Sequence, residues 1–106
     1  DPGKQVDDQI EEFLIQTVAE NPDVVVRRQA VLSLAVGKDV DPEVVEAVLA
    51  LYETSENLWE TFPVQQFFQY HAEELRTWPN FQTIRTRVAA VNSLYTANIL
   101  NYLDGN

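Results

Sequence analysis

The chain has 106 residues, 17 acidic and seven basic side chains, a net charge of −10 and no cysteine. The length suits one domain with one core, and the lack of cysteine excludes disulfides, thiolate metal sites and cysteine nucleophiles. The negative field disfavours nucleic acid and anionic membrane surfaces as direct partners and favours a basic protein.

The first predicted helix spans about residues 8–20. Asp8 and Glu11 have the spacing of a capping box at its start. The apolar side chains that follow recur at helical intervals on one face: Ile10, Phe13, Leu14 and Val18. This pattern predicts an amphipathic helix.

Two proline-containing boundaries begin the next two predicted helices. In Asn21-Pro22-Asp23, Asn21 is suited to cap a helix and Pro22 to occupy its first position. The predicted helix covers about residues 22–36 and ends at Gly37. Asp41-Pro42-Glu43 has the same pattern and predicts a helix over about residues 42–54.

The second half predicts two further helices, over about residues 63–77 and 80–103. Pro63 suits the first turn of a helix and begins an apolar stripe that ends at Leu75. Pro79 disfavours the α conformation at Trp78, so Asn80 is expected to cap a long final helix. Residues 55–61 remain ambiguous.

Residues 21–34 resemble the second helix of a HEAT-type repeat. In that family Asp or Asn and Pro open the turn, and Val-Arg is followed by a small residue and a late Leu. The matching residues are Asp23, Val26, Arg27, Ala30 and Leu34. Because residues 41–45 resemble the start of the next repeat, the resemblance covers residues 8–54.

The predicted fold is therefore all-α, with about five helices in a single domain over residues 1–106. It is either a HEAT-like α-α array or an irregular antiparallel helical bundle, since the predicted connections are short. Arg27 and Arg28 are expected to bind acids of a neighbouring helix, in line with the internal role of that arginine in the family. The candidate acids are Glu11, Glu12 and Glu46.

The sequence offers few groups for chemistry. His71 is the only histidine, and with Glu74 it would supply two ligands or an acid-base pair on one helical face. His71 also continues the apolar stripe of its helix, which favours a partly buried structural role. No Gly-rich phosphate loop or Gly-x-Ser-x-Gly motif is present. We predict no enzyme, and no catalytic, cofactor or metal site.

Aromatic side chains are concentrated in residues 59–81, which hold seven of the eleven in the chain. They either close the core around the helix at 63–77 or, where exposed, anchor a partner. The residues predicted to bind a partner are Trp59, Phe62, Tyr70, Arg76, Trp78 and Phe81.

Two functions follow as hypotheses. The first is a non-catalytic interaction module that holds a peptide or protein segment in an aromatic-rimmed groove between helices. The alternative is an acidic inhibitor or immunity-type protein that neutralises a basic partner.

The location of the protein stays open. No stretch is apolar for the 18 or more residues, roughly, that a membrane span needs, so we expect a soluble chain without membrane insertion. The chain contains no methionine and begins with no charged-then-apolar signal segment, which indicates processing or trimming. It is expected to be cytoplasmic or exported after signal cleavage.

Overall fold

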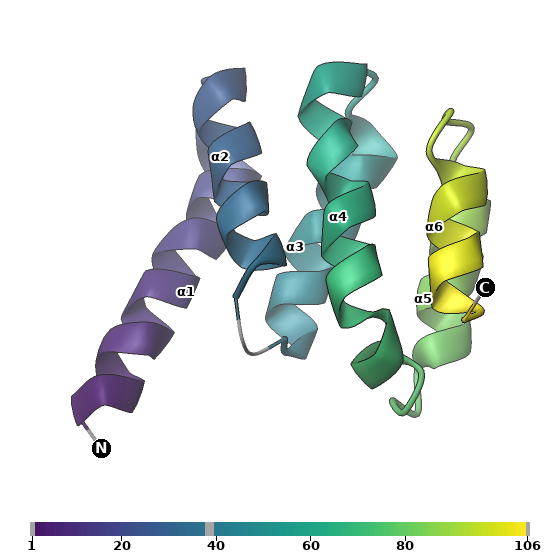
Figure 1. Cartoon of the computed structure of the whole chain (residues 1–106). Coiled ribbons are helices and arrows are strands. Elements are labelled where there is room, and N and C mark those ends of the chain that lie inside the picture. Colours follow the sequence, from purple (N-terminus) through teal and green to yellow (C-terminus); the bar gives the residue numbers. More distant parts are fainter. Residues whose placement is uncertain (1, 38–39, 106) are drawn as a thin grey trace.

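A computed structural model describes residues 2–37 and 40–105, with side chains from residue 7 onward. Residues 1, 38, 39 and 106 of the predicted domain lie outside the described residues. The described chain forms six α-helices and no strand (Figure 1). They are α1 (Pro2–Glu20), α2 (Val24–Ala35), α3 (Pro42–Thr54), α4 (Leu58–Leu75), α5 (Phe81–Ala89) and α6 (Thr96–Leu103). The all-α prediction is confirmed, whereas the predicted number of helices was one too low.

The helices form two layers. In Figure 1, α2, α4 and α6 lie in front of α3 and α5, and the upper part of α1 passes behind α2. Within the layers α2 contacts α4, α4 contacts α6, α1 contacts α3, and α3 contacts α5. The shortest dimension is 18 Å, about the thickness of two packed helices. Consecutive helices run in opposite directions, so neighbours within a layer run in the same direction (Figure 1).

The boundary between α1 and α2 differs from the prediction. α1 begins at Pro2, so Asp8 lies inside the helix and does not cap it. α2 begins at Val24, and Asp23 is its N-cap because its carboxylate accepts from the Val25 N–H. Asn21 instead accepts from the Asp23 N–H at 2.8 Å. Asn21 and Asp23 are both suited to cap α2, and Asp23, which lies nearer the helix, is the residue that does so.

The prediction for α3 is confirmed at both ends. Asp41 caps the helix by accepting from the Val44 N–H, and Pro42 occupies the first turn. Seven of its thirteen residues are buried, so α3 is the most enclosed helix. Its Tyr52 is 1% exposed, and its hydroxyl is hydrogen-bonded to that of Thr96, the first residue of α6.

The start of α4 was predicted five residues too late. Asn57 caps the helix by accepting from the N–H groups of Trp59 and Glu60. Pro63 therefore lies inside α4, where it removes the N–H that would bind the Trp59 carbonyl oxygen. A partner from α2 replaces that bond, as described below.

The predicted final helix is two helices, α5 and α6, joined by residues 90–95. The Ser93 hydroxyl accepts from the Tyr95 N–H, and the Thr96 hydroxyl donates to the Val91 carbonyl oxygen at 2.7 Å. Polar side chains that bind nearby backbone favour a turn over a continuous helix. The apolar periodicity did not reveal this break, because both antiparallel helices point their apolar residues into the same core.

One hydrophobic core runs through the two layers. Phe67 and Phe68 of α4 are fully buried at its centre, with their rings edge to face and 5.3 Å between centroids. Part of the aromatic concentration in residues 59–81 therefore fills the core. Within the described chain, no helix has both the length and the apolar character that a membrane span requires.

Candidate functional site

The six predicted partner-binding residues do not form one rim. Trp59, Phe62 and Tyr70 are exposed on α4, at 48%, 41% and 66% respectively. Trp78 and Phe81 are half-buried and pack against the core, where they close the connection between α4 and α5.

Arg76 is exposed but is engaged within the protein. Its Nη1 donates to the carbonyl oxygens of Tyr102 at 2.9 Å and Leu103 at 3.3 Å. These carbonyls lie at the end of α6, where a helix leaves its last acceptors without intrahelical partners. Arg76 thus joins the end of α4 to the end of α6.

The three exposed aromatic residues form a stripe on α4. Their spacing of three and eight residues places them on one side of the helix. Trp59 and Tyr70 are separated by about 16 Å along the axis, at a rise of about 1.5 Å per residue. We call Trp59, Phe62 and Tyr70 the α4 aromatic stripe.

Arg28 of α2 holds Trp59 in two ways. Its guanidinium carbon lies 4.5 Å from the centroid of the Trp59 ring, and its Nε donates to the Trp59 carbonyl oxygen at 3.0 Å. That carbonyl is the one deprived of its helical donor by Pro63. A single arginine therefore completes the helix and fixes an exposed aromatic ring.

Phe62 is held from the opposite side by Tyr95. The two rings meet edge to face, with 5.8 Å between centroids and an interplanar angle of 84°. The Tyr95 hydroxyl donates to the Leu58 carbonyl oxygen at 3.0 Å. The aromatic stripe is thus flanked by α2 at Trp59 and by the turn before α6 at Phe62.

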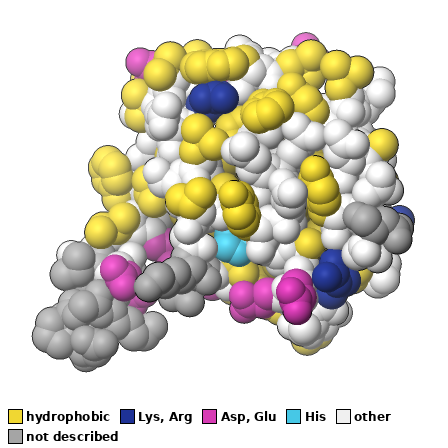
Figure 2. All heavy atoms as spheres, viewed as in Figure 1, with side chains coloured by type: hydrophobic (Ala, Val, Ile, Leu, Met, Phe, Trp, Pro, Cys, Tyr) yellow, Lys and Arg dark blue, Asp and Glu magenta, His cyan; other side chains and the backbone are white. Residues whose placement is uncertain are grey.

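Further apolar side chains are exposed on the elements beside the stripe. They are Val25 and Val26 of α2, Val36 at its C-cap, Leu58 of α4 and Leu94 of the turn before α6. Figure 2 shows the face formed by α2, α4 and α6, where apolar and uncharged side chains occupy most of the centre. Acidic side chains gather along its lower edge.

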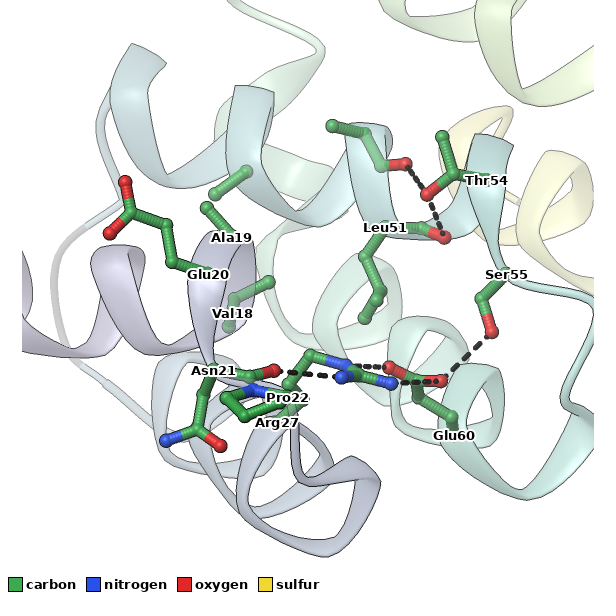
Figure 3. Close-up of a pocket in the computed structure, with 12 residues that line it drawn as sticks. Val18, Ala19, Glu20, Asn21, Pro22, Arg27, Leu51, Thr54, Ser55 and Glu60 are labelled. Atoms are coloured by element: carbon green, nitrogen blue, oxygen red, sulfur yellow. Dashed lines mark hydrogen bonds and ion pairs between the residues drawn. The ribbon is translucent and has the colours of Figure 1, made fainter.

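Arg27 binds Glu60, not the predicted Glu11, Glu12 or Glu46. Its Nε and Nη2 donate to the two carboxylate oxygens at 2.5 and 3.3 Å (Figure 3). The same figure shows Arg27 reaching the Asn21 carbonyl oxygen and Ser55 reaching Glu60. Glu60 is 2% exposed, so its charge is matched inside the protein. Bonding to Glu60 raises the pKa of Arg27 above its ordinary value.

A hollow of about 690 Å³ adjoins this ion pair. Its lining includes Arg27, Glu60, Ser55 and the end of α1, as Figure 3 shows. The charged groups here satisfy one another, and in the described part of the chain no buried side-chain nitrogen or oxygen lacks a hydrogen-bond partner. The ion pair therefore serves the fold, linking the start of α2 to the start of α4.

Three acids lie close together where α1 meets the start of α3. The carboxylate oxygens of Glu11, Asp41 and Glu43 lie within 4.8 Å of one another, the only such group of metal-ligand type among the described residues. A hydrogen bond with Asp41 and burial raise the pKa of Glu11 to about 7. Glu11 and Asp41 are thus a pair of like charges that favours a shared proton or a nearby cation.

His71 has the structural position that its apolar stripe predicted. It is 6% exposed, and its Nε2 lies 3.3 Å from the Leu34 carbonyl oxygen of α2. Its ring packs against Phe67 with 4.8 Å between centroids. Glu74 is exposed, and neither residue belongs to the acidic group described above.

Sequence reasoning missed Arg28 and Tyr95 as neighbours of the exposed aromatic residues. A signal for Arg28 was present, because a proline inside a helix leaves one carbonyl oxygen in need of a donor. The exposure of Val25 and Val26 also had a signal: consecutive helical residues point about 100° apart, so three successive valines do not all face one core.

Comparisons with protein-family models, with curated proteins and with solved structures found no significant match to this chain.

Proposed function

We propose that this protein is a non-catalytic interaction module that binds a peptide or protein segment across the α4 aromatic stripe. The observation that carries this proposal is the exposure of Trp59, Phe62 and Tyr70 on one side of α4. Large aromatic side chains that remain exposed together are typical of binding surfaces, and Trp and Tyr often contribute most of the binding energy.

Two of the three side chains of the stripe are also held in place before a partner arrives. Arg28 fixes Trp59, and Tyr95 fixes Phe62. A surface whose side chains are already ordered loses less conformational entropy on binding. The proposal includes no catalytic step, because His71 is buried against the Leu34 carbonyl oxygen.

For the architecture we propose a HEAT-type array. The odd-numbered helices begin at residues 2, 42 and 81, so successive hairpins start 40 and 39 residues apart. HEAT and armadillo repeats have periods of about 40 to 47 residues. Arg27 of the family-like motif links α2 to Glu60 at the start of the next even-numbered helix. In such arrays one layer of helices offers an extended binding surface.

A peptide selection tests the proposed function. Peptides are selected on the wild-type protein and counter-selected on a Trp59→Ala, Phe62→Ala double variant. We expect the selection to yield peptides that bind the Trp59→Ala and the Phe62→Ala single variants at least tenfold more weakly than the wild type, as is typical of aromatic anchor residues. Phe13→Ala is the matched control, because it removes an exposed aromatic ring from α1 and leaves the stripe intact.

Two results would contradict the proposal. Either the counter-selection leaves no binding peptides, or the recovered peptides bind the double variant as tightly as the wild type. Circular dichroism of each variant shows whether its helical content is retained.

As a second function we propose the capture of a basic partner. The net charge of −10 supports it. Binding of this kind should lose association rate steeply as salt rises, whereas binding to the aromatic stripe should change little. Association rates at low and high ionic strength therefore separate the two functions.

A further inference from the structure

The outer side of α1 carries apolar side chains that no other helix covers. Phe13 is 67% exposed and Ile10 is 53% exposed, although their spacing predicts the buried side of an amphipathic helix. Leu14 packs against the core and Val18 belongs to it. The apolar stripe of α1 therefore turns from the core at Val18 toward solvent at Ile10.

A groove lies between this part of α1 and the end of α2. It has a volume of about 320 Å³, and its apolar lining comes from Ile10, Leu14 and Leu34. Asp7, Glu11 and Ser33 supply polar groups beside them. The volume falls at the lower end for small-molecule sites and suits one or two large side chains.

The part of the chain that forms the groove is acidic in sequence. Residues 1–43 contain ten acidic and four basic side chains, the lysines included. Glu11 lines the groove and also belongs to the acidic group with Asp41 and Glu43. No arginine binds these acids, because all five arginines bind groups elsewhere in the described structure. In Figure 2, apolar side chains lie along the α1 edge at the left, with acidic side chains beneath them.

The acidic side chains beside the groove favour some binding partners over others. A second copy of the chain would bring its own net charge of −10 toward the acids of the groove, so like-charge repulsion disfavours it. A segment with lysine or arginine on either side of a large apolar residue matches both parts of the site, because its cations meet acids and its apolar side chain meets the groove.

We propose that the groove between α1 and α2 binds a basic protein segment, whose large apolar side chain enters between Leu14 and Leu34 and whose flanking lysine or arginine side chains pair with Asp7 and Glu11. The inference rests on the second function proposed above and is independent of the α4 aromatic stripe. It assigns the partner class and the place where the partner binds.

A short designed peptide tests the inference. The probe is an acetylated, fluorescent Lys-Lys-Phe-Leu-Lys-Lys peptide, and the two control peptides replace either Phe-Leu by Ala-Ala or all lysines by glutamate. We expect the probe to bind at about 20 mM salt and to weaken steeply by about 300 mM. Each control peptide should bind at least tenfold more weakly. Amide resonances should shift within residues 7–14 and 33–37.

Two protein variants locate the binding. Ser33→Trp fills the groove from an exposed position, and the Asp7→Asn, Glu11→Gln double variant removes its charges. Each should lower the affinity of the probe at least tenfold. Gln29→Trp, at an exposed position one turn earlier on α2, and Glu73→Gln, at an exposed position on α4, should leave it unchanged.

The outcomes separate the two proposals. If the probe binds Ser33→Trp as tightly as Gln29→Trp, the groove is not the site, although capture of a basic partner stands. If neither lysine peptide binds at low salt, both proposals fail. Equal binding of the glutamate peptide, or a dimer of the protein that Phe13→Ala abolishes, would also overturn the inference.

Discussion

The two ends of the helical array use their charged side chains differently. From α2 to α6, every arginine binds a group on another helix or at its end. Arg27 and Arg28 bind α4, Arg76 and Arg85 bind the end of α6, and Arg87 binds Glu46 and Glu53 of α3. α1 instead packs through apolar side chains, and the carboxyl group of its Glu11 lies against that of Asp41, the N-cap of α3.

This difference indicates two kinds of stability. Helices α2 to α6 are joined by charge-assisted hydrogen bonds that persist over a wide pH range, because arginine stays protonated. The contact between α1 and the start of α3 includes an acidic pair, and because the pKa of Glu11 is raised to about 7 we expect the stability contributed by α1 to respond to pH. Four substitutions test whether the two regions differ in this way.

Arg27→Met should have the largest effect. It leaves the buried Glu60 carboxylate without its cation, and we expect the free energy of unfolding to fall by about 3 kcal/mol, as for broken buried ion pairs. Urea unfolding followed by circular dichroism measures it. Adding Glu60→Gln should recover part of the loss, whereas Arg85→Ala, which breaks an exposed pair, should change little. An equal loss of unfolding free energy in Arg27→Met and Arg85→Ala would contradict the stabilising role of the buried Arg27–Glu60 ion pair.

Arg28→Ala should lower the free energy of unfolding by about 1 to 2 kcal/mol, because it removes a hydrogen bond and a cation–π contact. In a Pro63→Ala background the cost should be smaller by about 1 kcal/mol, since residue 63 then supplies the N–H that the Trp59 carbonyl oxygen lacks. A double-mutant cycle by urea unfolding measures this coupling. A coupling of zero would mean that Arg28 does not replace the missing helical bond.

Glu11→Gln should remove a pH-dependent change of about 1 kcal/mol in the free energy of unfolding. Solvent screening reduces this amount because Glu11 is partly exposed. The pKa of Glu11 is raised from 4.5 to about 7 by Asp41, burial and the charges of Asp8 and Glu43. The folded wild type therefore binds more protons than the unfolded chain between these values. Its stability should fall as pH rises from about 4.5 to about 7.

Unfolding of wild type and Glu11→Gln at several pH values provides the measurement. Above pH 7 the variant should be the more stable protein, because its amide can donate to the Asp41 carboxylate. Parallel pH profiles for the two proteins would contradict the assignment.

Phe13→Ser should have the smallest effect. Because Phe13 is 67% exposed, its replacement should change the free energy of unfolding by less than about 0.5 kcal/mol. Thermal and urea unfolding measure this change. A loss above about 1 kcal/mol would show that Phe13 packs within the fold and is not free for a partner.

The sequence predicted the helices best where a cap and a buried face agreed. At α3 the Asp41 cap stands directly before Pro42, and the buried residues of the helix repeat at helical spacing. At α4 the proline misled the prediction. Pro63 suits a first turn, but here it lies inside the helix and leaves the Trp59 carbonyl oxygen without a helical donor. Arg28, a residue distant in sequence, donates to that oxygen instead. A prediction made from the residues of one helix alone does not include a hydrogen-bond donor from another helix.

The candidate site was only partly predictable for a similar reason. The aromatic concentration in residues 59–81 was visible in the sequence, but its division between core and surface depends on which helices cover α4. Phe67 and Phe68 face the core, whereas Trp59 and Phe62 emerge beside α2 and the turn before α6. Asn92-Ser93 was the local signal for that turn, and the continuous apolar pattern concealed it.

The fluorescence of Trp59 shows whether the α4 aromatic stripe binds a partner. In a Trp78→Phe variant Trp59 is the only tryptophan. On titration with a peptide selected as described above, its emission should shift to shorter wavelength in proportion to the bound fraction, because binding removes water from the exposed ring. Saturable binding of the peptide with an unchanged Trp59 spectrum would contradict the claim.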